Sequence, residues 1–328
     1  MKIQSLEGYR AARYYTAWMD RTEQIGLLSV SGPDRFSWLQ GMVSNDVRLL
    51  EQGAKRLQAC ILNPTGHVLT DLALVAVANG QLPALHDCIL LDMPRENREK
   101  IGRLLDRFLI TEDVELNDVT PQLACLSLQG PAAAQRIQQL NLGPCVIVEA
   151  DHTGSGGFDI YVPTEMRDTL LHSLHIPVLD EATVELLRIE AGIPKYGAEL
   201  DESVIALEAN LRQTHISLSK GCYVGQEIMA RIESRGHTNR GLTGLVFSPN
   251  QIPDIGETLY PVQEPAREVG RITSVAASSP AMDNRPIALA FVRHEFAQPN
   301  TLLHAGASRK EAVVVPLPFI STTQGTSE

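Results

Sequence analysis

The sequence lacks paired cysteines, long apolar runs and any excess of basic residues. Its five cysteines are scattered and none belongs to a CxxC pair, which excludes a zinc knuckle or a cysteine-held iron–sulfur cluster encoded by local spacing. An odd number of widely spaced cysteines is typical of reduced thiols, so we expect a cytoplasmic protein. The longest apolar run, residues 72–78, is too short to cross a bilayer, and the N-terminal residues show no secretory or transit signal.

Acidic residues outnumber basic ones. The chain has 39 Asp and Glu against 28 Lys and Arg, which gives a formal net charge of −11. This balance argues against a broad basic surface for nonspecific nucleic-acid binding, and we expect neither a stable nucleic-acid partner nor a membrane partner. The length of 328 residues is sufficient for two or three domains, each with its own core.

Residues 1–120 show a pattern of strands and helices typical of a ferredoxin-like lobe. A proline suits the first position of a helix, so Gly32 and Pro33 predict a helix start. Pro64 and Gly66 mark a turn, and the apolar runs on either side of it predict a hairpin. The predicted strands are residues 27–30, 57–63, 68–78, 88–92 and 114–119, and an amphipathic helix covers residues 101–109.

A similar pattern follows in residues 121–240, which we assign to a second lobe. Residues 29–33 and 127–131 both end in Gly-Pro after a strand-like run, and they are separated by 98 positions. We interpret them as a weak internal repeat of a ferredoxin-like unit; the alternative is coincidence, because Gly-Pro commonly opens a helix. The predicted strands are residues 123–128, 145–148 and 158–162, with helices after residues 130 and 163 and over residues 181–191.

From residue 241 onward the character of the sequence changes. Six short strand-like runs separated by Gly, Pro, Asn and Ser predict a small antiparallel barrel or sandwich over residues 241–320. Residues 321–328 are polar, and we expect them to be disordered. The six runs are residues 242–247, 258–261, 269–275, 287–292, 302–303 and 312–315.

Cys222 lies in the segment with the strongest functional signal. Gly225 is followed by residues without a helix breaker, which predicts a helix whose N-terminus lies just after Cys222. Unpaired N–H groups at a helix N-terminus favour an anion, and Lys220 adds a positive charge two positions before the cysteine. Both effects favour the thiolate form of Cys222. The alternative is a small buried hydrophobic residue, the usual state of a free cysteine.

Asp71 is a second candidate, because it interrupts an apolar strand. A carboxylate that faces inward from such a strand requires a partner, whereas the alternation of a strand could equally turn Asp71 to solvent. Arg188 and Glu190 lie two residues apart on a predicted helix and cannot share a face, so we expect one of them to point into a binding site. The other four cysteines fall in apolar strands, where structural burial is expected.

Residues 220–227, Lys-Gly-Cys-Tyr-Val-Gly-Gln-Glu, resemble the signature of the YgfZ proteins, which are folate-binding relatives of the glycine-cleavage aminomethyltransferase. The resemblance covers roughly residues 20–315. Softer matches occur in the same order as in that family, at residues 39–41, 44–47, 62–71, 187–197 and 207–211.

The resemblance implies an α+β fold with two ferredoxin-like lobes and a C-terminal antiparallel β-barrel around a central, folate-sized opening. The first two lobes can be interleaved in sequence. It implies tetrahydrofolate or another reduced folate as cofactor. The implied role is support of the assembly or repair of iron–sulfur enzymes, including tRNA-modifying ones. Transient contacts with those enzymes or with cluster-assembly proteins are expected.

The resemblance also implies which residues serve this role. Cys222 is expected to be the functional thiolate, with Lys220 and Asp71 as further catalytic residues. The expected folate-binding residues are Asn63, Asp71, Arg188, Glu190, Tyr223, Gln226 and Glu227, and no metal ligands are assigned.

Two departures bear on an alternative function, aminomethyl transfer of the glycine-cleavage type. Aminomethyltransferases tend to have paired carboxylates where this chain has Thr70 and Asp71, and a glutamate where it has Ser155. Each lost carboxylate removes a charge-assisted pair worth about 1.5–3 kcal/mol, which disfavours this alternative. A second alternative is a folate-binding scaffold in which Cys222 is only packed. These residues do not decide whether a one-carbon transfer is catalysed.

Overall fold

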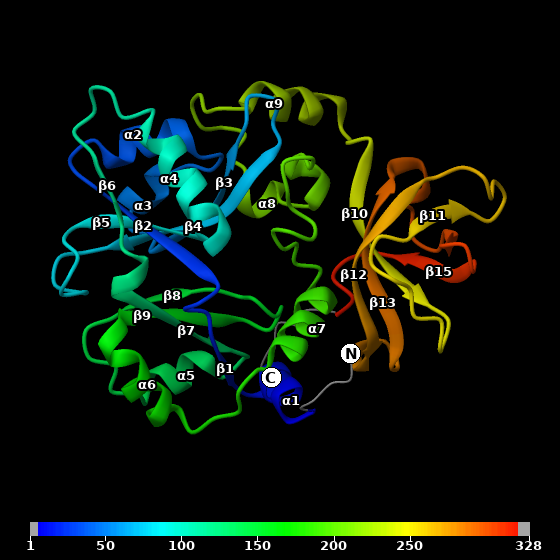
Figure 1. The fold of residues 1–328 in the computed structure, drawn as a ribbon, viewed down its shortest axis with the longest axis horizontal. Coiled ribbons are helices and arrows are strands. Elements are labelled where there is room, and N and C mark those ends of the chain that lie inside the picture. The colour runs from blue at the N-terminus through cyan, green and yellow to red at the C-terminus, as the bar shows by residue number, and fades with distance from the viewer. Residues whose placement is uncertain (1–5, 321–328) are drawn as a thin grey trace, which may run out of the picture.

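The described part of the chain, residues 6–320 of a computed structural model, forms three lobes (Figure 1). Two lobes of mixed strands and helices lie on one side and a barrel lies on the other, with helix α7 (Glu181–Ala191) between them. The predicted fold class is confirmed, because the protein combines two antiparallel sheets with a closed six-stranded antiparallel barrel. The tail of residues 321–328, predicted to be disordered, lies outside the described residues.

A five-stranded antiparallel sheet in the order β3-β4-β5-β2-β6 forms the first lobe. Side chains alternate between the two faces of a strand, so Leu74 of β4 joins a core beneath the helices, whereas its neighbour Val75 joins a core shared with the second lobe. Its elements are β2 (Ile25–Ser31), α2 (Arg35–Met42), α3 (Arg48–Glu51), β3 (Arg56–Leu62), β4 (Val68–Val77), β5 (Cys88–Pro94), α4 (Arg98–Asp106) and β6 (Glu115–Asp118).

The second lobe has a four-stranded sheet in the order β1-β7-β9-β8, and its edge strand comes from the start of the chain. Strand β1 pairs with β7 through residues 17–20, although the predicted division assigned these residues to the first lobe of residues 1–120. A four-residue strand carries no pattern that specifies its partner, so tertiary packing decides it. The elements are α1 (Leu6–Tyr14), β1 (Ala17–Asp20), β7 (Leu123–Gln129), α5 (Ala133–Gln138), β8 (Val146–Glu149), β9 (Gly157–Pro163) and α6 (Arg167–Leu174).

All six strand-like runs predicted after residue 241 form strands, and they close into a barrel in the order β10-β13-β12-β11-β14-β15. Closure removes the exposed edges that an open sheet would present. The strands are β10 (Arg240–Phe247), β11 (Thr258–Pro261), β12 (Gly270–Ser279), β13 (Arg285–Arg293), β14 (Leu302–Ala305) and β15 (Lys310–Val315).

The segment between the second lobe and the barrel connects all three lobes. Asp180 caps α7 by accepting a hydrogen bond from the Thr183 backbone N–H, and Gly192 ends the helix with a φ of 68°. Helices α8 (Arg212–His215) and α9 (Gln226–Arg235) follow, and α8 contacts β3 of the first lobe. Short 3-10 helices are Arg95–Asn97, Thr120–Gln122, Thr164–Met166, Ala206–Ala209, Pro280–Met282 and His294–Phe296.

Within residues 6–320, none of the helices combines the length and the apolar character needed to pass through a bilayer.

Candidate functional site

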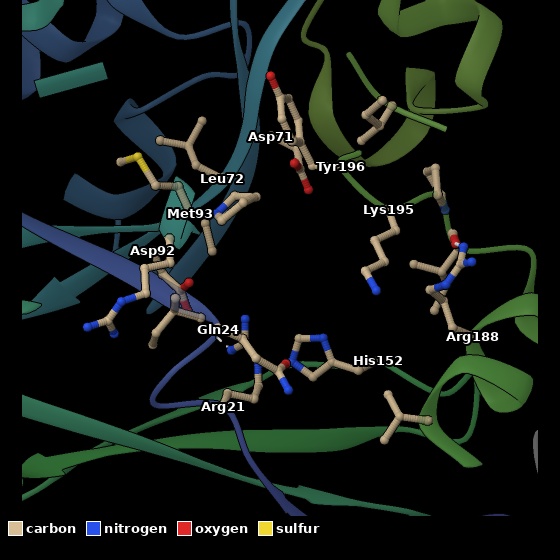
Figure 2. Close-up of a pocket in the computed structure, with 18 of the residues that line it drawn as sticks. Arg21, Gln24, Asp71, Leu72, Asp92, Met93, His152, Arg188, Lys195 and Tyr196 are labelled. Carbon is tan, nitrogen blue, oxygen red and sulfur yellow. Dashed lines mark hydrogen bonds and ion pairs between the residues drawn. The ribbon is translucent and has the colours of Figure 1, made fainter. Parts of the chain in front are cut away.

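A cavity of about 760 Å³ lies between the two sheets and α7 (Figure 2). Its volume falls within the range of roughly 300–1,000 Å³ that is typical of small-molecule sites. Strands β3, β4 and β5 supply one wall, and α7 with the residues that follow it supplies another. Among the described residues, no lining side chain comes from the barrel, which instead contacts α7 from behind.

Asp71 on β4 points into this cavity (Figure 2). Its Oδ1 atom is buried and has no hydrogen-bond partner in the described structure. Burial, assisted by the negative charge of Asp92, raises the pKa of the Asp71 carboxyl to about 6. A buried carboxylate oxygen without a donor is unfavourable, so the position favours a ligand that supplies one. The alternative that Asp71 is turned to bulk solvent is therefore wrong.

Thr70 faces away from the cavity. It is fully buried, its hydroxyl donates to the Asp71 backbone carbonyl at 2.8 Å, and it accepts from the Asn97 side chain at 3.1 Å. Because neighbouring positions on a strand face opposite sides, an acid at position 70 would not point into the site. The Thr70 departure therefore leaves the cavity-facing carboxylate in place.

A charged network that sequence reasoning missed forms the floor of the cavity. The Arg21 Nη1 atom lies 2.5 Å from Asp159 Oδ2 and 3.2 Å from Asp92 Oδ2, so it joins a strand of each sheet. The Tyr161 hydroxyl donates to Asp92 at 2.5 Å, and His152 Nε2 lies 3.1 Å from Asp159. Burial opposes the charge of Asp159, but Arg21 and His152 outweigh it and hold its carboxyl pKa well below the usual range.

This network also explains a close group of possible metal ligands. Ligand atoms of Asp92, Cys125 and Asp159 lie within 4.8 Å of one another. The Arg21 guanidinium already supplies the cation, with Nη1 at 3.7 Å from the Cys125 sulfur. We therefore assign no metal here. The only signal available in the sequence was that Asp92 and Asp159 interrupt apolar strands, as Asp71 does.

Arg188 lines the cavity, and Glu190 does not, so only one of the pair points inward as expected. The Arg188 guanidinium is held by Glu185, by the buried Glu199 at 2.9 Å and by Ser274 of the barrel at 2.7 Å. Through these ion pairs and this hydrogen bond, Arg188 connects the wall of the cavity to the barrel.

Glu190 belongs to a separate buried network that joins α1, α7 and the barrel. Its carboxylate accepts hydrogen bonds from Tyr9, Arg13 and Ser279, and its side chain is fully buried. Ser155 accepts a hydrogen bond from the same Arg13 at 2.8 Å. Neither Glu190 nor Ser155 lines the cavity, so the predicted role of Glu190 in folate binding stays a prediction.

The signature segment lies outside the cavity. Helix α9 begins after Gly225, which adopts a φ of 85°, and Cys222 precedes it as predicted. Cys222 is exposed, so the alternative of a buried, packed cysteine is wrong, yet it does not line the cavity. Of the other four cysteines, predicted to be buried, only Cys145 is half-exposed; it precedes β8.

Lys220 anchors this segment to the first lobe. Its side chain is buried, and the ammonium donates to the backbone carbonyls of Gln40, Val43 and Asn45 at 2.6–2.8 Å. Burial lowers its pKa to about 8. These three acceptors satisfy the ammonium, so the residue has a structural role in addition to the predicted catalytic one.

The remaining predicted folate-binding residues surround this anchor. Tyr223 is buried, and the Lys220 ammonium lies 5.0 Å from the centre of its ring. Glu227 is exposed. Asn63 shapes the β3–β4 turn by accepting backbone hydrogen bonds, and Gly225 packs so closely on that turn that a Cβ would lie 2.7 Å from the Asn63 carbonyl oxygen. Gln226 donates to the Lys220 carbonyl. None of these residues lines the cavity, so the predicted folate-binding residues lie in three separate places: the cavity, the Glu190 network and the surroundings of Lys220.

Two domain families match the chain. The GCVT N-terminal domain matches residues 6–143, and the glycine cleavage T-protein C-terminal barrel domain matches residues 240–320. The second match covers the barrel described above, and the first covers the sheet that carries Asp71. The chain is therefore a GcvT-like protein. The narrower resemblance to the YgfZ proteins stays a prediction.

Relatives of this chain are named aminomethyltransferases. The protein from Caldanaerobacter subterraneus subsp. tengcongensis is 28% identical over 300 residues, which cover 84% of this chain and 76% of the relative. The protein from Geobacillus sp. (strain WCH70) is also 28% identical, over 342 residues that cover 95% of this chain and 89% of the relative. The crystal structure of glycine cleavage system aminomethyltransferase T from Bartonella henselae matches with a TM-score of 0.80 at 20% identity, covering 96% of this chain and 89% of that one. This last likeness concerns the fold.

Proposed function

We propose that the protein binds a reduced folate in the central cavity and transfers a one-carbon unit to it, as an aminomethyltransferase. Asp71 carries this proposal, because its unpartnered oxygen is buried in a cavity of ligand size. The pKa of about 6 for its carboxyl is close to neutral pH, as suits a group that exchanges protons with a substrate. The relatives' function supports the same conclusion.

The lining of the cavity suits a reduced pterin. The half-buried Pro94, Val184 and Tyr196 supply apolar surface for a flat ring, and Asp71 accepts a hydrogen bond from an amine of the ligand. The floor beneath is held rigid by the Arg21 network, so little reorganisation is needed on binding.

The proposed reaction joins the carbon of a carrier-bound aminomethyl group to two nitrogens of tetrahydrofolate. The C–S bond to the carrier sulfur and the C–N bond of the aminomethyl group break, and bonds to N5 and N10 form. The two N–H protons of the folate go to the departing sulfur and to the departing amine, which leaves as ammonia. In this proposal Asp71, which lines the cavity, accepts the N5 proton and passes it to the amine.

An assay with tetrahydrofolate and an aminomethyl-loaded lipoyl carrier tests this proposal. We expect saturable binding of tetrahydrofolate and formation of methylene-tetrahydrofolate with one equivalent of ammonia. Binding without product would instead favour a folate-binding scaffold. Absence of binding by calorimetry would refute the proposal altogether.

A second candidate function is favoured by the exposure of Cys222. In this candidate the protein supports the assembly or repair of iron–sulfur enzymes, including tRNA-modifying ones, and Cys222 acts as a thiolate at the surface beside α9. Docked iron–sulfur enzymes or assembly proteins could reach an exposed thiol directly, whereas a sulfur inside the folate cavity would be shielded.

Replacing Cys222 by alanine tests the second candidate. We expect Cys222→Ala to abolish complementation of a cluster-maintenance defect while changing stability by less than about 0.5 kcal/mol, because the side chain is exposed. Folate affinity should be unchanged. Cys145→Ala is the matched control and should complement fully. Full complementation by Cys222→Ala would remove the thiol from the function.

A further inference from the structure

Arg56 contributes a cation to the lining of the cavity. Its side chain lines the cavity, its Nε atom is buried without a hydrogen-bond partner, and within residues 6–320 the guanidinium forms no ion pair. A buried guanidinium N–H without an acceptor is unfavourable, and nothing in the fold of the described residues provides one. The position therefore favours a ligand that brings an acceptor, preferably an anion.

The neighbouring groups cannot serve as that acceptor. The charge of Arg56 contributes to the lowered pKa of Asp159, but this carboxylate is already paired with Arg21 and His152. Burial, together with the charge of Arg56, lowers the pKa of the His215 imidazole to about 4. At neutral pH this imidazole therefore carries no charge. The positive charge of Arg56 is therefore available to a ligand.

The strand register relates Arg56 to Asp71. On the hairpin, Cys60 is opposite Asp71, Gln58 is opposite Ala73 and Arg56 is opposite Val75. Arg56 is thus four residues along β3 from the level of Asp71, or about 13 Å at the usual rise of a strand. Gln58 also lines the cavity and lies between the two levels. One wall therefore presents an acceptor at one end, an amide in the middle and a cation at the other end.

We propose that Arg56 binds a carboxylate of the glutamate moiety of the folate. This inference rests on the proposed folate binding and adds the part of the ligand that Arg56 recognises. A reduced folate carries amines on its pterin, an amide after its benzoyl ring and carboxylates on its glutamate, in the same order as Asp71, Gln58 and Arg56 along the wall. Arginine matches a carboxylate through two parallel N–H groups, which makes this contact selective.

Comparing tetrahydrofolate with tetrahydropteroate, which lacks the glutamate, tests this inference. We expect the wild-type protein to bind tetrahydrofolate roughly 10- to 100-fold more tightly than tetrahydropteroate, because a charge-assisted contact contributes about that much affinity. In Arg56→Gln the two dissociation constants should become nearly equal, because only the glutamate contact is lost. Arg56→Lys should retain part of the preference. Lys55→Gln, which removes an exposed charge beside β3 outside this cavity, should retain all of it.

The outcomes separate this inference from the proposed function. If the wild-type protein binds neither ligand, folate binding itself fails. If it binds both equally, or if Arg56→Gln weakens both by the same factor, the role of Arg56 is overturned while folate binding stands. A thermal melt of each variant verifies that the comparison concerns folded protein.

Discussion

Replacing Asp71 by asparagine is expected to lower the rate of one-carbon transfer by about 10²- to 10⁴-fold, the usual contribution of a positioned acid–base group. Asparagine keeps the size of the side chain and removes its proton exchange. Because the wild-type carboxyl has a pKa of about 6, kcat/KM of the wild type should rise as pH increases through 6. Steady-state rates from pH 5 to 8 should show this limb in the wild type and not in Asp71→Asn.

Asp106→Asn is the matched control, since Asp106 is an exposed acid of the same lobe. It should preserve both the rate and the pH profile. A rate for Asp71→Asn within threefold of the wild type would contradict an acid–base role for Asp71.

The same substitution has a second consequence, for stability. Burial raises the folded-state pKa of Asp71 above its ordinary value of 3.8, so the folded state prefers the protonated form. Stability from this group is therefore present below about pH 4 and is lost as pH rises through 6. Asp71→Asn mimics the protonated form and should increase the free energy of unfolding at pH 7.5 by on the order of 2 kcal/mol, with little change at pH 4. Urea denaturation at both pH values measures the difference.

Replacing Arg21 by methionine is expected to lower the free energy of unfolding by about 3–5 kcal/mol, because two buried carboxylates lose their shared cation. Asp92 belongs to the first sheet and Asp159 to the second, so the loss should loosen the contact between the lobes. Thermal and urea denaturation at pH 7.5 measure this effect.

The pH dependence adds a sharper test of the Arg21 network. In the wild type the pKa of Asp159 is depressed, so its contribution is present at neutral pH and is lost at acidic pH. The difference between wild type and Arg21→Met should therefore shrink below about pH 4. Arg103→Met removes an exposed pair with Glu99 and should cost only about 0.3–0.5 kcal/mol. Equal effects of the two substitutions would mean that the buried network contributes little.

The local sequence pattern was sufficient to predict those elements that depend only on residues close together in the chain. The barrel strands, the hairpin around Pro64 and Gly66, and the helix start after Gly225 were all predictable, because turn residues and alternation act over a few positions. The exposure of Cys222 was not predictable, because the same spacing suits a buried and an exposed thiol.

The site depended on contacts between distant segments. Asp71 could be identified as an unusual carboxylate, but only the packing of two sheets shows that its Oδ1 has no donor among residues 6–320. The roles of Arg21 and Arg56 had no local signal, since one lies in a turn and the other at the start of a strand. Lys220 had a signal, but its three carbonyl partners come from residues about 180 positions away.

By itself the sequence determined the barrel strands, most of the other strands, the α+β class and two candidate residues, Asp71 and Cys222, because propensity and alternation are local properties. The tertiary structure decided that β1 completes the second sheet and that Asp71 and Cys222 lie in different places. It also decided that the buried Arg56 Nε atom has no acceptor among the described residues. These features depend on which buried polar groups meet a partner, and that is settled only when segments far apart in the chain pack together.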